Sequence, residues 1–285
     1  MRYQKAGILY HPREPAAFTL AQELAKTVLR PLSPWLAQTG DTATCAANLD
    51  GTDLAVCVGG DGTVLWAART VAPRGAHIVS VNMGRLGFLS ELAPESAAEH
   101  LAAILDGAGM LDERSLVECV ATGTDPRDAV AALALNDVVV YRAAPGRPVD
   151  FSVAIDGVHL ARLRADALIV STATGSTAYN LSAGGPVLMP QSGDLVLTAV
   201  APHLSRMRPL VLPGEATIEI RVENQSEGLV TADGEVVRSL ADGCAVVCRR
   251  SAHTAAFIRM GPPSNFFARL ADHLNLSTQG RDAIR

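Results

Sequence analysis

The first third of the chain alternates short apolar runs with segments in which apolar residues recur at helical spacing. The runs at residues 6–10, 54–58 and 77–81 predict buried strands, and residues 15–29, 63–71 and 96–105 have the spacing of amphipathic helices. Strands that alternate with helices in this way predict a parallel sheet joined by right-handed crossovers.

From about residue 111 the pattern changes to closely spaced strand-like runs. They lie at residues 116–121, 131–141, 151–155, 167–171, 195–200, 216–222, 229–232 and 245–249. Asp-Gly pairs at 156–157, 233–234 and 242–243 separate several of these runs, and such pairs favour the tight turns of β-hairpins. Residues 264–274 have helical spacing again, with Ser264 as the N-cap.

The predicted fold class is therefore an α/β N-terminal lobe, a parallel sheet with flanking helices, followed by a mostly antiparallel, β-rich second lobe. We place the first lobe at residues 1–110 and the second at 111–263, with a C-terminal helix within 264–285 that can return to the first lobe.

Composition narrows the class of protein. Of 285 residues, 24 are Lys or Arg and 29 are Asp or Glu, so the formal net charge is −5, which disfavours nucleic acid as a partner. The uncharged stretch at 167–193 is long enough to cross a membrane, but Gly, Pro and polar residues interrupt it, so we expect no membrane span. Five cysteines without a C-x-x-C pair suggest reduced thiols in a cytoplasmic protein.

The sequence Gly-Gly-Asp-Gly-Thr at 59–63 directly follows a predicted buried strand and directly precedes a predicted helix. Glycines at this place let a phosphate approach the backbone, and the helix N-terminus offers unpaired N–H groups. Asp61 can hold a metal, accept a proton from a hydroxyl, or merely cap the helix. Because it lies at a helix N-terminus, we expect a low pKa for its carboxyl group.

Two further polar segments interrupt apolar strands. Residues 172–186 begin with a hydroxyl-rich turn that can bind phosphate or ribose, or can serve as an ordinary Ser/Thr cap. Asn136 and Asp137 lie within the predicted strand 131–141, where buried polar groups are costly unless they are satisfied. They can bind a ribose, as the acidic residue of dinucleotide folds does, or mark a strand bulge.

Four motifs in this order resemble those of the NAD kinase family. They are Gly-Gly-Asp-Gly-Thr at 59–63, Asn-Met-Gly-Arg-Leu-Gly-Phe-Leu at 82–89, Asn-Asp at 136–137 and Thr-Gly-Ser-Thr-Ala-Tyr at 174–179. The first motif alone is also found in diacylglycerol and sphingosine kinases, but the four together are specific. The resemblance extends from the first strand to about Phe267.

The resemblance implies an NAD kinase, a phosphotransferase that phosphorylates the 2′-hydroxyl of the adenosine ribose of NAD to give NADP. The donor would be ATP or polyphosphate, with Mg²⁺ or another divalent metal whose protein ligands the sequence does not identify. A homodimer or homotetramer is also implied, because in the family residues matching Arg164 and Asp166 reach the NAD of a neighbouring subunit.

The resemblance also assigns roles to single residues. Asp61 would be the catalytic residue that faces the 2′-hydroxyl. The phosphate and ATP path would be lined by Gly59, Gly60, Gly62, Thr63 and Asp233, the last of which an Asp-Gly hairpin turn explains as well. The residues matching the NAD site are Gly62, Phe88, Asn136, Asp137, Arg164, Asp166, Thr174, Thr177, Ala178, Tyr179 and Ser182; for Phe88 a place in the core is an equal alternative.

Two other functions use the same motifs. A lipid or other small-molecule kinase would share the glycine-rich loop, but it would leave residues 136–137 and 174–179 unexplained. A non-catalytic regulator would bind NAD without turning it over. The choice of ATP or polyphosphate, and the acceptance of NADH, stay open at this stage.

Overall fold

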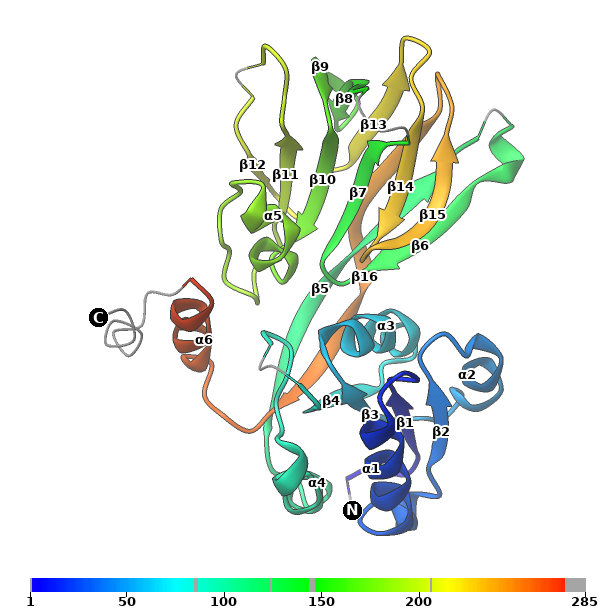
Figure 1. The fold of residues 1–285 in the computed structure, drawn as a ribbon, viewed down its shortest axis with the longest axis vertical. Helices are drawn as coiled ribbons and strands as arrows, with labels where there is room; N and C mark the ends of the chain where they lie inside the picture. The colour runs from blue at the N-terminus through cyan, green and yellow to red at the C-terminus, as the bar shows by residue number, and fades with distance from the viewer. Residues whose placement is uncertain (1, 85–86, 124, 144–146, 206, 275–285) are drawn as a thin grey trace. The chain divides into compact units, whose positions relative to one another are not determined.

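The computed structural model describes residues 2–84, 87–123, 125–143, 147–205 and 207–274 (Figure 1). The chain forms two compact units, unit 1 from residues 1–112 and 256–285 and unit 2 from residues 113–255. It passes from unit 1 to unit 2 within strand β5 (Met110–Ala121) and returns within strand β16 (Ala245–Arg259).

Unit 1 contains the predicted parallel sheet. Its strands lie in the order β2-β1-β3-β4, with every neighbouring pair parallel, and the end of β16 pairs with β4 through Phe257 and Ile78. The bounds are β1 (Ala6–Tyr10), β2 (Trp35–Gln38), β3 (Leu54–Gly59) and β4 (His77–Asn82). Every residue of β3 is buried, as its uninterrupted apolar run predicted.

The helices of unit 1 follow its strands. They are α1 (Pro15–Lys26), α2 (Thr42–Asn48), α3 (Asp61–Val71), α4 (Ala97–Leu105) and α6 (Asn265–His273). Short 3₁₀ turns lie at Arg30–Leu32, Ala72–Arg74 and Pro94–Ser96. Ser264 is the N-cap residue of α6, but its hydroxyl makes no capping hydrogen bond. Residues 275–285 of the predicted C-terminal helix lie outside the described residues.

Strand β2 and helix α2 were not predicted from the sequence. The strand has only four residues and follows two prolines, Pro31 and Pro34, so its apolar run is short. The helix buries only Cys45 and is otherwise made of small or polar residues, which hides the helical period. Asp41 caps α2 by accepting a hydrogen bond from the Thr44 amide at 3.0 Å.

Unit 2 consists of antiparallel sheets, as predicted. One sheet has the order β12-β11-β10-β7-β14-β15, and in the other β16 pairs with β13, β13 with β8 and β8 with β9, while β5 pairs with β6 and β16. The bounds are β6 (Val130–Ala134), β7 (Asp137–Arg142), β8 (Val149–Ile155), β9 (Val158–Ala165), β10 (Ala167–Thr172), β11 (Leu195–Val200), β12 (Leu210–Leu212), β13 (Ile218–Glu223), β14 (Gly228–Ala232) and β15 (Glu235–Leu240).

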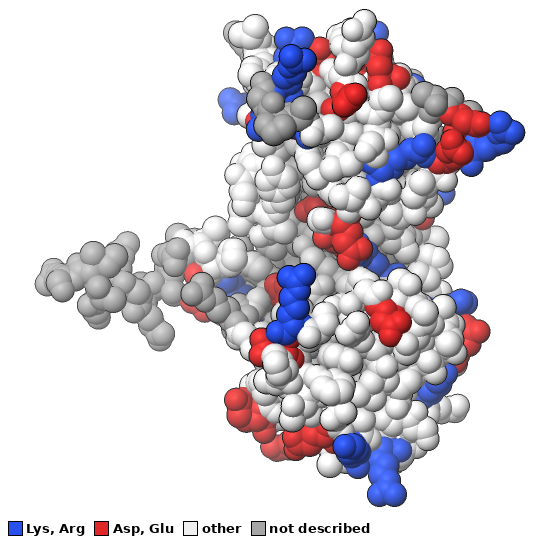
Figure 2. All heavy atoms as spheres, turned by 45° about the vertical axis from the view of Figure 1, so that its right-hand side comes forward, with Lys and Arg blue, Asp and Glu red and all other residues white. Residues whose placement is uncertain are grey.

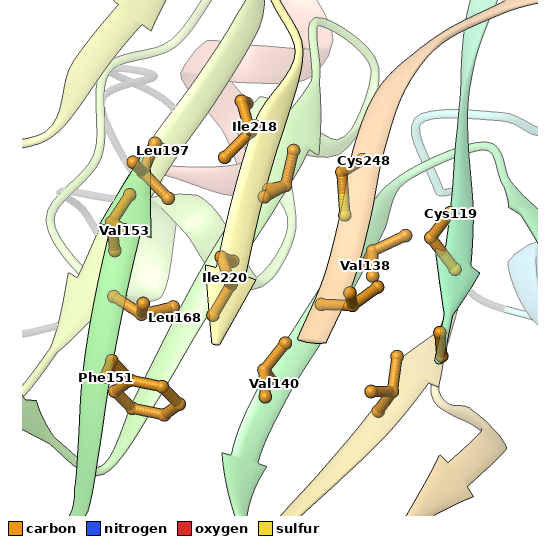
Figure 3. Packing of buried hydrophobic residues seen from close by; sticks show 14 of the residues in the cluster. Cys119, Val138, Val140, Phe151, Val153, Leu168, Leu197, Ile218, Ile220 and Cys248 are labelled. Atoms are coloured by element: carbon orange, nitrogen blue, oxygen red, sulfur yellow. The ribbon is translucent and has the colours of Figure 1, made fainter. Parts of the chain in front are cut away.

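Side chains from both sheets of unit 2 form one hydrophobic core (Figure 3). Phe151 of β8 and Ile220 of β13 belong to it, together with Val140 of β7 and Leu168 of β10 from the other sheet. Each of these residues alternates along its strand with residues on the opposite face, so the sheets pack as a sandwich. Cys119 and Cys248 also lie in this core, and all five cysteines are buried and free.

Two of the three predicted Asp-Gly turns join hairpins; the pair at 242–243 lies between β15 and β16, which pair with other strands. The pair at 156–157 connects β8 with β9 and the pair at 233–234 connects β14 with β15; both residues of each pair have positive φ, as a type I′ turn requires. Strands β9 and β15 themselves were missed, because they contain polar and charged residues on their exposed faces.

The prediction of one strand over residues 131–141 was wrong. The chain leaves β6 at Ala134 and begins β7 at Asp137, and these strands pair with different neighbours. At the break, the Asp233 carboxylate accepts hydrogen bonds from the backbone amides of Leu135 and Asn136. These amides are therefore not used for pairing with a neighbouring strand. A side chain far along the chain therefore ends one strand and starts the next.

Candidate active site

The glycine-rich segment of unit 1 lies where strand β3 ends and helix α3 begins. Gly59 is the last residue of β3, Gly60 is the N-cap of α3, and Asp61 is its first residue. The Thr63 amide donates to the Gly60 carbonyl at 3.0 Å and closes the first turn. The carboxyl end of a parallel strand and a helix N-terminus thus meet at one loop, an arrangement suited to phosphate.

The Asp61 carboxylate is packed tightly against the loop that follows β4. A Cβ atom placed on Gly87 would lie 2.3 Å from both carboxylate oxygens, so only glycine fits beside Asp61. Within the described part of the chain, the buried Oδ1 atom of Asp61 has no hydrogen-bond partner of normal geometry. The same is true of the buried hydroxyl of Thr63. Because buried polar atoms are normally satisfied, these two atoms indicate a place for a ligand.

Burial raises the pKa of Asp61 above the ordinary value for aspartate. The backbone amides of Leu89 and Phe88, the Ser90 hydroxyl and the charge of Arg259 lower this pKa, but they do not outweigh burial. Our expectation of a low pKa was therefore wrong. The helix N-terminus was visible in the sequence, whereas the burial arises from the loop that covers the carboxylate.

The other predicted residue of unit 1 is Phe88. Its ring packs against two rings from the end of the chain, Phe266 at 6.2 Å and His273 at 4.9 Å between centroids. At least one side of the Phe88 ring is therefore packed against aromatic side chains of this protein. Arg85 and Leu86, which belong to the same predicted motif, lie outside the described residues.

In unit 2, Asn136 and Asp137 lie at the break between β6 and β7. The Asp233 carboxylate accepts three consecutive amides there, from Leu135 at 2.8 Å, Asn136 at 2.7 Å and Asp137 at 3.2 Å. The Asp233 amide in turn donates to the Asp137 carbonyl at 3.0 Å. This hairpin residue, which sequence reasoning assigned to the phosphates, thus holds the backbone of the predicted NAD-binding pair.

Burial, together with the nearby charge of Asp233, raises the pKa of Asp137 to about 7. Asp137 is only 6% exposed. Near neutral pH its carboxyl group therefore exists in both protonation states, so it can donate as well as accept a hydrogen bond.

The hydroxyl-rich segment forms a compact buried turn, a 3₁₀ helix at Gly175–Thr177, followed by the short helix α5 (Tyr179–Ser182). The hydroxyls of Thr172, Ser176 and Thr177 donate to the carbonyls of Leu135, Ala173 and Thr174 at 2.6, 2.6 and 3.2 Å. Sequence reasoning expected these hydroxyls to serve a ligand, but they also build the turn itself. Further along, Ala178 is partly exposed, and Tyr179 and Ser182 are exposed.

This turn rests directly on Asn136. The Thr172 amide donates to the Asn136 carbonyl at 2.9 Å. A Cβ atom placed on Gly175 would lie 2.0 Å from that same carbonyl oxygen and 2.4 Å from its carbon. The two segments of unit 2 that were predicted to bind NAD, distant in sequence, are therefore packed backbone against backbone.

Arg164 and Asp166 are engaged in ion pairs with other residues of unit 2. Arg164 on β9 makes two hydrogen bonds of 2.8 Å to the Asp150 carboxylate, which lower the pKa of Asp150. Asp166 accepts a hydrogen bond of 3.0 Å from Arg142. The Arg164 side chain is 55% exposed, so it remains open to a partner.

Sequence reasoning missed one buried cation beside the turn. Arg114 on β5 is 7% exposed and donates to the Thr174 hydroxyl at 3.3 Å. A buried arginine is rare unless it is paired. In the sequence Arg114 follows two acidic residues at the start of β5, and nothing in this charged segment indicates that its side chain is buried.

Known proteins with related sequences decide the family. Residues 32–108 match the model of the ATP-NAD kinase N-terminal domain, and residues 135–260 match the ATP-NAD kinase C-terminal domain. The NAD kinase of Dehalococcoides mccartyi (strain CBDB1) is 38% identical over 269 residues, which cover 94% of this chain and 95% of that protein. The chain belongs to the NAD kinase family.

Other relatives agree with this assignment. The NAD kinase of Chloroflexus aurantiacus (strain ATCC 29366 / DSM 635 / J-10-fl) is 34% identical, covering 96% of this chain and 99% of that one. An NAD kinase from Archaeoglobus fulgidus, solved in complex with ATP, has a TM-score of 0.72 at 27% identity, covering 93% of this chain and 98% of that one. Yeast NADH kinase, solved with NADH, shares the fold with a TM-score of 0.83 at 22% identity, covering 97% and 89%.

Membership of the NAD kinase family confirms the predicted fold class and makes the chain an NAD kinase phosphotransferase. It removes the lipid kinase as an alternative. No helix in the described ranges has both the length and the apolar character to span a membrane. On the face shown in Figure 2, basic and acidic side chains are interspersed.

Replacement of Gly175 by alanine is expected to destabilise this NAD kinase by about 3 kcal/mol or more, because the new Cβ collides with the backbone of Asn136 and not with a movable side chain. NAD affinity should fall as well, since Asn136 is displaced. Gly84→Ala is a suitable control, because a Cβ there has open space. Thermal unfolding and NAD titration measure both effects; equal melting temperatures for the two variants would contradict the close approach.

Because the pKa of Asp137 is raised, we expect the stability of the protein to depend on pH. Its folded pKa of about 7 lies above the value for an unfolded aspartate, so its contribution to stability is complete below about pH 4 and is lost as the pH rises through 7. The variant Asp137→Asn should lack this loss, and its melting temperature should exceed that of the parent by more at pH 8 than at pH 5. A difference that does not change with pH would show that Asp137 titrates normally. The exposed Asp242→Asn serves as the control.

Proposed function

We propose that the chain transfers the γ-phosphoryl group of ATP, or a terminal phosphoryl group of polyphosphate, to the 2′-hydroxyl of the adenosine ribose of NAD. The products are NADP and ADP, or NADP and shortened polyphosphate. The relatives solved with ATP and with NADH support nucleotides of these two kinds as ligands.

The observation that carries this proposal is the Asp61 carboxylate. Its Oδ1 atom is buried, has no partner of normal geometry in the described ranges, and lies at the start of the helix that follows the glycine-rich loop. In our proposal this oxygen accepts a hydrogen bond from the 2′-hydroxyl and orients it toward the phosphorus. As the new O–P bond forms and the bond to ADP breaks, the hydroxyl proton leaves to Asp61.

The raised pKa of Asp61 fits this role, because a carboxylate with a higher pKa accepts a proton more readily than an ordinary aspartate does. Phosphoryl transfer nevertheless depends mainly on alignment and on neutralising charge. We therefore assign orientation to Asp61 first and proton acceptance second. Gly59, Gly60, Gly62 and the Thr63 hydroxyl are proposed to line the phosphates.

A divalent metal, Mg²⁺ by preference, is proposed to accompany the phosphates. Among the residues that the structure describes, no group of three His, Cys, Asp or Glu side chains is placed to hold a metal ion. Mg²⁺ keeps several waters and commonly binds through substrate phosphates, so a dedicated protein cage is not needed. When bound, the metal would neutralise charge on the transferred group.

We propose that NAD is held in unit 2 by Asn136, Asp137, Thr174, Thr177 and the short helix that contains Ala178, Tyr179 and Ser182. The close packing of Gly175 on Asn136 supports this, since it makes these residues one rigid structure. Phe88 of unit 1 is proposed as an aromatic contact of NAD on the part of its ring that α6 leaves free.

A homodimer or homotetramer is proposed, in which Arg164 and Asp166 contribute to the NAD of a neighbouring subunit. The 55% exposure of the Arg164 side chain supports this role. The five buried free cysteines fit a cytoplasmic enzyme. Light scattering would give the number of subunits.

The test is a coupled assay that measures NADP from NAD with Mg-ATP, other nucleoside triphosphates and polyphosphate, and repeats each donor with NADH. We expect NADP from NAD with at least one donor. No product with any donor would overturn the proposal, and tight NAD binding without turnover would favour the non-catalytic regulator.

A further inference from the structure

The loop that follows strand β4 is held by two arginines from the end of the chain. Arg269 on α6 donates through Nη1 to the carbonyls of Phe88 at 3.2 Å and Ser90 at 2.7 Å. Arg259, the last residue of β16, donates through Nη1 to the carbonyl between them, that of Leu89, at 3.1 Å. Three consecutive carbonyls of one loop are therefore bound by two guanidinium groups.

A buried carboxylate links the two arginines. The Oε2 atom of Glu91 accepts hydrogen bonds from Arg259 Nη1 at 3.1 Å and from Arg269 Nη2 at 3.3 Å. Its Oε1 atom accepts a hydrogen bond from the Met260 amide at 2.8 Å. Arg259 also donates through Nε to Asp112 at 3.1 Å. The Glu91 side chain is 6% exposed, so the charges are paired away from water and the geometry of the network is fixed.

The same loop faces Asp61 with its other side. Gly87 is in contact with the carboxylate, and the amides of Phe88 and Leu89 and the hydroxyl of Ser90 act on it. In a trans peptide the carbonyl and the N–H point in opposite directions within one plane. A bond that holds the Phe88 carbonyl therefore also orients the Leu89 amide.

Arg259 has a second property that Arg269 lacks. Its positive charge acts on the Asp61 carboxylate, and among the described residues it is the only charged group with a resolved effect there. Its Nη2 atom is buried and has no hydrogen-bond partner in the same part of the chain. The two arginines thus share the loop contacts but differ in their electrostatic effect on Asp61.

We propose that Arg259 and Arg269 are positioning residues for the phosphorylation of NAD, which hold the 88–90 loop and through it the orientation of the Asp61 carboxylate. This inference rests on the proposed role of Asp61. It gives the C-terminal return of the chain, from β16 to α6, a part in catalysis without contact to either substrate.

The experiment compares Arg259→Met, Arg259→Lys and Arg269→Met with the parent enzyme, measuring kcat, KM for NAD and KM for ATP from pH 5 to 9. Both methionine variants should lower kcat by about ten- to hundredfold, because a small misplacement of a reacting group is costly, while KM for NAD stays within about threefold. Only Arg259→Met should move the acidic limb of the kcat profile to higher pH. Arg259→Lys keeps the charge, so its limb should stay in place while kcat falls.

The matched pair separates catalysis from stability. If kcat is unchanged in the folded variants, or if KM for NAD rises while kcat does not change, the inference is wrong. It is also wrong if the acidic limbs of Arg259→Met and Arg269→Met coincide. Should Arg259→Met fail to fold because Glu91 and Asp112 lose their partner, Arg259→Lys and Arg269→Met decide the question through kcat alone.

The proposed function fails in a different way. A parental kcat in the variant Asp61→Asn would remove the role of Asp61 on which this inference depends. An inactive Asp61→Asn together with arginine variants of parental kcat would leave the proposed function intact and overturn only the positioning role.

Discussion

Replacing Asp61 by asparagine is expected to lower kcat by about 10²–10⁴-fold while NAD affinity stays within about tenfold. The amide has the size of the carboxylate, so it fits the space beside Gly87 that the carboxylate now fills. It cannot take a proton, and its NH₂ group can occupy the position from which Oδ1 would accept the 2′-hydroxyl. The chemical step is therefore impaired while the proposed NAD contacts in unit 2 are untouched.

The same variant is expected to be at least as stable as the parent at neutral pH. Burial disfavours the charged form of Asp61 and raises its pKa, so its ionisation opposes folding as the pH rises. A rise in melting temperature together with a loss of kcat would show that the carboxylate is kept for function at a cost in stability.

Steady-state kinetics, isothermal titration with NAD and thermal unfolding give the three quantities. Asp50→Asn is the control, because the Asp50 side chain is 86% exposed and lies in the same unit. Parental kcat in Asp61→Asn would refute the proposed role. A loss of NAD affinity that accounts for the whole effect would reassign Asp61 to binding.

Replacing Asp233 by alanine is expected to destabilise the protein by several kcal/mol and to weaken NAD binding. Three backbone amides lose a shared acceptor, and each hydrogen bond to a charged group contributes about 1.5–3 kcal/mol. Two of these amides belong to Asn136 and Asp137, so the predicted NAD-binding pair loses its support.

Asp242→Ala is the matched control, since Asp242 lies in another Asp-Gly turn and is exposed. Thermal unfolding, NAD titration and KM for ATP distinguish two roles of Asp233. A lower melting temperature with weaker NAD binding supports the backbone role seen in the structure. A raised KM for ATP at parental stability would instead return Asp233 to the phosphates, as the sequence suggested.

The arrangement of strands and helices in unit 1 was largely predictable. The period of apolar residues and the glycines after β3 are local properties of the chain, and they decided the strands, most helices and the place of the glycine-rich loop. Strand β2 and helix α2 escaped because their few apolar residues give no clear period. In unit 2 two of the three Asp-Gly pairs identified hairpins. Strands β9 and β15, which have charged exposed faces, were not predicted.

The sequence alone also determined the family, because four motifs in a fixed order are more specific than any one of them. It named Asp61, Asn136 and Asp137 as the residues of interest. It could not give the burial or the pKa of their side chains. The pKa of Asp61 depends on a loop that packs against it and on Arg259 from the other end of the chain, and these contacts form only when the chain folds.

The tertiary structure alone decided what holds the site together. Asp233 ends one strand and begins another by binding amides 97 residues earlier in the sequence. Arg114 reaches Thr174, and Arg259 and Arg269 bind the loop beside Asp61. Each is a long-range hydrogen bond between a charged side chain and a distant partner. Local patterns encode where strands, helices and turns occur, but the burial of a charge and the identity of its partner are properties of the folded chain.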